Sequence, residues 1–349
     1  MNRLKAWLQP KILGTAAIVL GGSLGASALW FQTQGKGEPQ AKAAGTCPEN
    51  MNWIQGGTFT MGSNDHYAEE ESVEDVQVTG FCIDRHEVTN GQFAEFVAAT
   101  GYKTLAERPL SAQDYPQLTE AQRQPGSLVF KMPEDPTQPI MELSWWHWTP
   151  GANWQHPEGP GSSIEGLDNY PVVHIAWEDA IAYAQWAKKQ LPTEAQWEFA
   201  ARGGLEGMVF TWGNEYRADL ANSWQGKFPF VNTKEDGHPG LAPVGSYPAN
   251  GYGLHDMAGN VWEWTQDWYR SGHDEKHHQT NPTGPAQEES FDPGEPGVSK
   301  HVIKGGSYLC APNYCSRFRP GARESQSPDT GTSHIGFRLV VVPDAGTTP

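Results

Sequence analysis

The sequence predicts a single compact domain of the α+β class with little regular secondary structure, and three observations support this. Glycine (39) and proline (27) are abundant among the 349 residues, so loops and turns should form much of the fold. Helical patterns are few and short, and brief apolar runs of strand type occur between the loops. The 15 tryptophans and 13 phenylalanines supply enough bulky apolar surface for a sizeable core.

The first helix is expected over residues 88–100, where Phe93 and Phe96 recur at helical spacing. Thr89 or Asn90 can cap its amino-terminal end, and the glycine that follows is a stop signal. The pattern therefore predicts a short amphipathic helix.

Two further helices are expected in tandem. The segment 176–189 repeats the helical spacing of apolar residues. Thr193 and Gln196 then form the sequence pattern of a capping box, which should open a second helix that runs through Arg202.

Brief strands are expected at three apolar runs, residues 76–83, 172–177 and 337–342. The stretch from 210 to 307 is rich in glycine and proline, which predicts loops there. Because no repeat of solenoid period is evident, these elements should form one domain.

The amino-terminal segment, residues 1–35, has the pattern of a signal peptide or an N-terminal membrane anchor. Basic residues precede an uncharged run over 12–35, which is typical of export signals. A small-x-small triplet at 26–28 fits a cleavage site, but the run is long enough to remain as an anchor, so both interpretations stay open. Residues 36–46 read as a linker and 47–349 as the folded domain, which is expected to be periplasmic, secreted or membrane-anchored outside the cytosol.

The charge of the chain excludes one class of partner. Lys and Arg number 24 against 41 Asp and Glu, a formal net charge of −17. This charge repels phosphate backbones, so we expect no nucleic acid partner. The acidic run Glu69–Glu71, with Glu74 and Asp75, is interpreted as an exposed loop without a function.

The cysteines fall into two pairs. Cys47 and Cys82 are expected to form a structural disulfide, because export permits it and they flank the opening segment of the domain. Cys310 and Cys315 lie five residues apart near several basic residues, which would favour thiolates. Their spacing alone fits a structural disulfide, a redox-active pair or a soft-metal site, and it does not decide among them.

Two loop segments carry oxygen donors between glycines. Residues 222–238 and 256–263 offer carboxylate, amide and carbonyl oxygens of the kind that surround a hard cation such as Ca²⁺. Polar residues that only stabilise turns would give the same pattern.

Several motifs resemble those of the sulfatase-modifying-factor family over residues 51–341. They are Gly57–Gly62 (GTFTMG), Asp84–Thr89 (DRHEVT), Leu191–Glu198 (LPTEAQWE), Gly251–Leu254 (GYGL), Gly259–Trp264 (GNVWEW) and Gly336–Arg338 (GFR). Within that family, the stretch 305–323, with Cys310, Cys315 and three arginines, is similar to the formylglycine-generating enzymes.

The resemblance implies the fold of those enzymes, which is related to C-type-lectin-like architecture, and an oxidase activity. Such enzymes use O₂, a thiol reductant and Cu(I) to oxidise a cysteine to Cα-formylglycine. The cysteine belongs to a Cys-x-Pro-x-Arg segment of an unfolded sulfatase. By resemblance, Cys310 and Cys315 are the copper ligands, and Ser307 and Trp262 line the catalytic pocket. The enzyme is expected to act as a monomer.

The resemblance also implies two structural Ca²⁺ sites. The first would use Asn222, Ser223, Asp236 and the backbone of His238; the second would use Asp256, Gly259, Val261 and Glu263. For the substrate, Trp145, Trp146 and Trp154 are expected to pack against its proline, while the acidic charge favours its arginine.

The alternative from another class is a non-catalytic scaffold or peptide-binding module of the same fold, in which Cys310 and Cys315 form a structural disulfide. A third, weaker hypothesis is a thiol-disulfide exchanger. The state of this cysteine pair discriminates among the three.

Overall fold

A computed structural model of the chain describes residues 46–113, 115–121, 123–135, 143–273 and 279–343. These belong to one compact unit, residues 44–349. The predicted signal or anchor at 1–35, and all of the 36–46 linker except its last residue, lie outside the described residues. No helix in the described part of the chain is both long enough and apolar enough to cross a membrane.

Short strands and loops dominate the unit. The strands are β1 (Met51–Ile54), β2 (Gly57–Met61), β3 (Glu74–Val78), β4 (Phe81–Asp84), β5 (Gly126–Phe130), β6 (Trp146–Pro150), β7 (Trp262–Trp268), β8 (His301–Lys304), β9 (Arg323–Gln326), β10 (Ile335–Gly336) and β11 (Val340–Val341). The helices are α1 (Asn90–Thr100), α2 (Trp177–Trp186) and α3 (Glu194–Arg202), with 3₁₀ turns η1 (Ala68–Glu70), η2 (Leu105–Glu107), η3 (Ala218–Leu220) and η4 (Gln287–Glu289).

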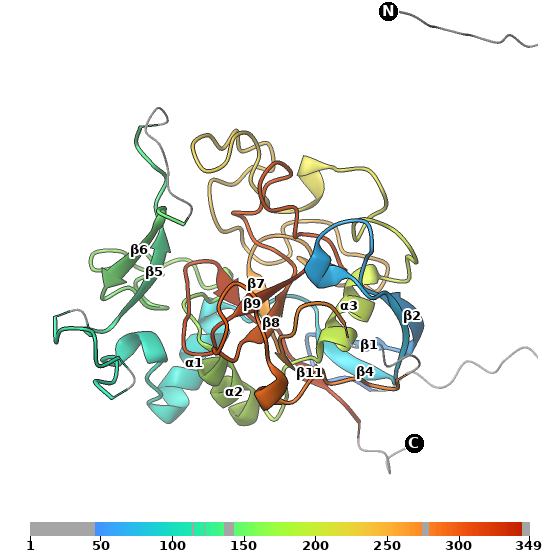
Figure 1. Ribbon diagram of the computed structural model, residues 1–349, viewed down its shortest axis with the longest axis horizontal. Helices are drawn as coiled ribbons and strands as arrows, with labels where there is room; N and C mark the ends of the chain where they lie inside the picture. Colours follow the sequence, from blue (N-terminus) through green and yellow to red (C-terminus); the bar gives the residue numbers. More distant parts are fainter. Residues whose placement is uncertain (1–45, 114, 122, 136–142, 274–278, 344–349) are drawn as a thin grey trace, which may run out of the picture. The chain divides into compact units, whose positions relative to one another are not determined.

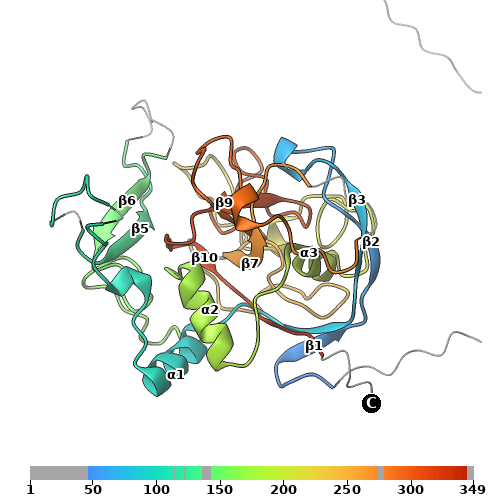
Figure 2. The same ribbon diagram turned by 60° about the horizontal axis from the view of Figure 1, so that its bottom comes forward.

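The strands form small sheets around a central one. The central sheet has the order β10-β7-β8-β9, and β1-β4-β11, β2-β3 and β5-β6 form the others. In Figures 1 and 2 the β5-β6 hairpin and the β2-β3 pair lie on opposite sides of the central sheet. α3 packs against β2, β3, β7 and β8, so it connects the central sheet to the β2-β3 pair.

All three helix predictions are confirmed. The residues that mark the ends of α1 and α3 lie next to those helices in the sequence, where they can be recognised. Thr89 and Gln92 form a capping box before α1, and Gly101 closes that helix with a left-handed φ of 66°. Thr193 and Gln196 form the equivalent box before α3.

The strand predictions were only partly correct. Residues 76–83 form parts of β3 and β4 rather than one strand, and β11 covers only two residues of the run 337–342. No strand forms over 172–177: His174 has a left-handed φ of 61°, which breaks an extended run. The prediction of loops over 210–307 missed β7 and β8 in the central sheet.

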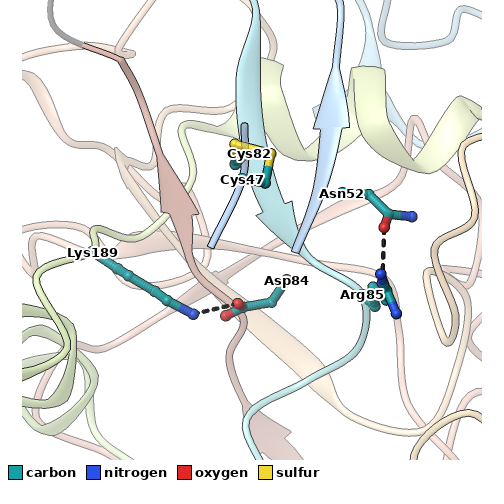
Figure 3. Close-up of a disulfide and its surroundings, with 6 residues drawn as sticks. All are labelled: Cys47, Asn52, Cys82, Asp84, Arg85 and Lys189. Carbon is teal, nitrogen blue, oxygen red and sulfur yellow. Dashed lines mark hydrogen bonds and ion pairs between the residues drawn. A yellow bond between two sulfur atoms is a disulfide. The ribbon is translucent and has the colours of Figure 1, made fainter. Parts of the chain in front are cut away.

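The predicted disulfide between Cys47 and Cys82 is confirmed (Figure 3). Cys82 lies on β4, where it is buried and opposite Trp53 of β1. The bond therefore fixes the beginning of the domain to the sheet β1-β4-β11.

We expect replacement of both Cys47 and Cys82 by serine to lower the free energy of unfolding by about 3–4 kcal/mol, because the bridge restricts the unfolded chain. Urea unfolding followed by tryptophan fluorescence measures the change, with the intact protein as control. An unchanged unfolding midpoint with an unchanged slope would contradict this role.

Candidate active site

Cys310 and Cys315 lie in the connection between β8 and β9, residues 305–322, which we name the thiol loop. Lys304 and Arg323, at its two ends, are register partners in the central sheet. Lys304 Nζ lies 3.4 Å from Glu194 Oε1, and Arg323 Nη2 lies 2.7 Å from Glu194 Oε2. Both cations and this carboxylate are buried, so α3 holds both ends of the loop.

A close backbone approach folds the thiol loop back on itself. Gly306 has a φ of 70°, and a Cβ at this position would meet Phe318 N at 2.9 Å. Any larger residue would push the two arms of the loop apart. The glycine therefore explains why the sequence can bring residues 310 and 315 together.

The two thiols are free and adjacent. Cys310 is buried and Cys315 is half-buried. Their Sγ atoms lie 2.7 Å apart, within hydrogen-bonding distance. The hydrogen bond from Cys310 lowers the pKa of Cys315, and the Arg317 guanidinium lowers it further, although burial opposes both. Burial raises the pKa of Cys310, so Cys315 is the thiol that ionises first.

The acidic run Glu69–Glu71 was wrongly interpreted as an exposed loop without a function. Glu70 is fully buried and forms a two-pronged ion pair with Arg319, and Glu69 pairs with Arg317. Only Glu71 within the run is exposed. The partners lie about 250 positions away in the chain, which no local pattern can reveal.

Tyr67 completes this contact between η1 and the thiol loop. Its hydroxyl accepts a hydrogen bond from Ser316 N at 3.1 Å, next to Cys315. Arg317 lies over its ring, with the guanidinium carbon 4.1 Å from the centroid. These contacts fix the backbone on the carboxyl-terminal side of Cys315.

The thiols open into a cleft of about 860 Å³. Ser307 and Trp262, the other two predicted catalytic residues, line the same cleft. Cys310 N donates to Ser307 O at 2.9 Å, and Trp262 is 4% exposed. The structure therefore brings together all four of the predicted catalytic side chains.

Aromatic residues form one wall of the cleft. Trp145 and Trp146 lie there as expected, with Phe228 and Tyr314, whose rings stack with their centroids 4.4 Å apart. The expectation for Trp154 was wrong: it packs in the core with its centroid 5.3 Å from that of Phe93. Its position three residues after Gly151 gave no sign that it points inward.

The first predicted calcium segment forms a closed loop. Asp236 accepts hydrogen bonds from Ser223 N and Gln225 Nε2 on Oδ2, and from His238 N on Oδ1. Asn222 is buried and pairs with Gly259 of the second segment. The predicted residues thus lie close together, joined by Gln225, which the sequence did not indicate.

The second segment contains an excess of buried carboxylates. Asp256, Glu263 and Glu87 are buried near one guanidinium, Arg338, which forms a two-pronged ion pair with Glu263 at 2.7 Å. Asp256 Oδ1 and Glu87 Oε2 have no hydrogen-bond partner in the described part of the chain. Burial and the neighbouring Asp256 raise the pKa of Glu87. Sequence reasoning missed Glu87, although it lies within the DRHEVT motif.

The donor atoms of the cleft and of the second segment determine which metal ions could bind there. Within the described ranges, no group of three or more His, Cys, Asp or Glu side chains could hold a metal ion. In the cleft the donors are the two thiols, a set that fits a linear Cu(I) ion. Near Asp256, the unpaired carboxylate oxygens Asp256 Oδ1 and Glu87 Oε2 are donors of the kind that Ca²⁺ prefers.

Arg317→Gln should raise the pKa of Cys315, because the guanidinium stabilises the thiolate and glutamine does not. The pH dependence of Cys315 alkylation, measured by mass spectrometry of the peptides, should move to higher pH. Arg217→Gln, which removes a cation from an exposed pair with Asp219, is the control and should leave it unchanged. An unmoved midpoint in Arg317→Gln would refute the electrostatic role of Arg317.

The chain matches the sulfatase-modifying factor enzyme 1-like domain over residues 35–343. It is 46% identical over 299 residues to the formylglycine-generating enzyme of Mycobacterium tuberculosis, an alignment that covers 84% of this chain and 98% of that protein. The inactive C-alpha-formylglycine-generating enzyme 2 of Bos taurus is 36% identical over 294 residues, covering 83% and 87%.

Solved structures agree on the fold. The structure of PvdO from Pseudomonas aeruginosa has a TM-score of 0.57 at 23% identity and covers 86% of this chain and 99% of that one. The match to the family domain extends over most of the chain and includes the thiol loop and both oxygen-rich segments. The chain therefore belongs to the sulfatase-modifying factor family, as its motifs indicated.

Proposed function

We propose that the protein is a formylglycine-generating oxidase that converts a cysteine of a sulfatase to Cα-formylglycine. The observation that carries the proposal is the pair of free, adjacent thiols in an open cleft. The relatives that bear the name formylglycine-generating enzyme support this reaction class. The finer proposal is that O₂ and Cu(I) are required and that the substrate segment is Cys-x-Pro-x-Arg.

Cys310 and Cys315 are the proposed copper ligands, because two soft sulfur donors suit Cu(I) and no third ligand is needed for linear coordination. When bound, the ion would supply the activation of O₂. Cys315, whose thiolate is the more readily formed, faces Arg317. Cys310 forms the buried side of the site. Trp262 and Ser307 line the cleft beside the thiols.

The reaction requires four electrons for O₂. The substrate Cβ supplies two of them as one Cβ–H bond and the C–S bond break and a C=O bond forms, and a thiol reductant supplies the other two. The products are the aldehyde, hydrogen sulfide, water and a disulfide of the reductant. An external thiol is therefore a co-substrate in this proposal.

The substrate segment is proposed to bind extended, from an unfolded sulfatase. Trp145 and Trp146 line the cleft that contains the thiols, and such aromatic faces favour contact with proline. A segment buried in a folded client could not bring its thiol to Cys310 and Cys315, because Cys310 is only 2% exposed.

We also propose that Ca²⁺ binds both oxygen-rich segments and stabilises the fold. At the second segment, the unpaired buried oxygens of Asp256 and Glu87 support this, since a buried carboxylate without a partner is costly. Export from the cytosol is proposed as well, and it fits the disulfide between Cys47 and Cys82.

The alternative, a non-catalytic module with a Cys310–Cys315 disulfide, is favoured by one observation: the sulfurs are close enough to be joined after a small movement. A family member named inactive also exists. The experiment below separates the two hypotheses.

Reduced protein should bind one equivalent of Cu(I), and with O₂ and a thiol reductant it should convert a Cys-x-Pro-x-Arg peptide to the aldehyde. Cys310→Ser or Cys315→Ser should abolish both properties, because one thiolate cannot hold the ion. Mass spectrometry of the peptide and a competitive Cu(I) chelator measure the two effects.

The matched control is Ser316→Ala, in the same loop, because only the backbone N of Ser316 contacts Tyr67. This variant should keep both properties. Full turnover in either cysteine variant would overturn the proposed chemistry, and a stable disulfide that resists reductants would favour the alternative.

Removal of Ca²⁺ by a chelator should lower Tm by several degrees. A ligand that binds only the native state stabilises it by about 2.7 kcal/mol at a hundred times its Kd. Glu87→Gln should reduce this calcium-dependent shift, whereas Glu206→Gln, on an exposed loop, should not. Calorimetric melts with and without chelator test this, and identical melts of the unmodified protein would rule out stabilising Ca²⁺.

A further inference from the structure

The cleft that contains the thiols has a second end, formed by residues 286–300. This segment is held firmly: Phe291 N donates to Tyr269 O at 3.0 Å, and Lys300 N donates to Ser290 Oγ at 3.0 Å. Asp292, Glu295 and Lys300 of the segment line the cleft together with Cys310 and Cys315. Charged side chains in this part of the chain therefore face any polypeptide bound at the thiols.

The charges at this end do not balance. Lys300 Nζ lies between two carboxylates, 2.6 Å from Asp292 Oδ2 and 2.9 Å from Glu295 Oε2. The single ammonium group of Lys300 is thus paired with two carboxylates. The group keeps a net negative charge on the cleft wall, which attracts a further cation.

Glu295 is the carboxylate best placed to bind that cation. Asp292 also accepts hydrogen bonds from Ser325 Oγ and Gly294 N, and its side chain is only 16% exposed. Glu324, also in the cleft, faces Arg317 at 3.2 Å and is 38% exposed. The Glu295 side chain is 58% exposed and uses Oε2 for Lys300, so a ligand can reach it without breaking a buried contact.

Side-chain contacts also connect Glu295 with the part of the cleft that holds the thiols. A line of contacts leads away from the thiols through Arg317 and Glu324, then through Ser325 and Asp292, to Lys300 and Glu295. In Cys-x-Pro-x-Arg the arginine follows the cysteine by four residues, so its Cα lies up to about 13–14 Å away in an extended chain. An extended segment can therefore bring its arginine to a part of the cleft away from the thiols.

We propose that Glu295 binds the arginine guanidinium of the substrate and so determines specificity at that position. This inference rests on the proposed function, because the substrate segment is part of it. The planar guanidinium has several donors that match a carboxylate, and lysine lacks this geometry.

The test measures binding apart from turnover. Fluorescent peptides in which serine replaces the reactive cysteine carry Arg, Lys, Ala or Glu at the last position, and they are titrated into the metal-free reduced protein. The unmodified protein should bind the Arg peptide about two- to fivefold more tightly than the Ala peptide, as expected for a partly exposed ion pair. Glu295→Gln should remove that preference, and Glu295→Lys should favour the Glu peptide.

Glu206→Gln removes the same charge from an exposed loop elsewhere and should keep the full preference for Arg, which separates a local contact from net charge. Unchanged discrimination in both Glu295 variants, or no preference for Arg in the unmodified protein, would overturn the assignment. Failure of the proposed function has a different result: peptides are still discriminated, but the cysteine-containing peptide is never oxidised.

Discussion

The geometry of the site depends on one buried carboxylate, Glu194, which binds the cations at both ends of the thiol loop. Although burial opposes ionisation, Arg323 and Lys304 lower the pKa of Glu194, so it stays charged. Burial and the charge of Glu194 raise the pKa of Asp267 to about 8, so that side chain adds no second anion at neutral pH. Loss of one partner from such a buried group costs about 3–5 kcal/mol, and here it would also release the loop.

The two oxygen-rich segments hold the same loop from the other side. Trp224 N, in the first segment, donates to Cys310 O at 2.9 Å. In the second segment, Gly259 N donates to Gly305 O at 2.8 Å, and a Cβ at Gly259 would lie 2.0 Å from Asn222 O. The segments are thus packed on each other and bonded to the loop, so any cation that stiffens them also fixes the thiols.

The sequence predicted what is encoded locally and missed what depends on distant partners. Apolar spacing with a cap residue predicted α1, a capping box predicted α3, and the resemblance of the stretch 305–323 to the formylglycine-generating enzymes indicated the site. The burial of Glu70, by contrast, requires Arg319, which lies 249 positions away. β7 (WEWTQDW) escaped prediction because it lies in a stretch whose glycine and proline content predicted loops, and because its polar residues Glu263, Thr265 and Asp267 are buried. The inward position of Trp154 likewise depends on Phe93, a residue of another segment.

The difference between the two cysteine pairs follows from their surroundings. Cys47 and Cys82 join the beginning of the domain to a strand, and no basic side chain is bonded to them among the described contacts in Figure 3. Cys310 and Cys315 lie in a loop that two sets of ion pairs hold from outside, and their protonation differs: burial favours the neutral form of one, and its neighbours favour the thiolate of the other. The two cysteines of a structural disulfide do not need to differ in protonation. The two thiols also differ in position, because Cys310 is buried in the wall of the cleft whereas Cys315 is only half-buried.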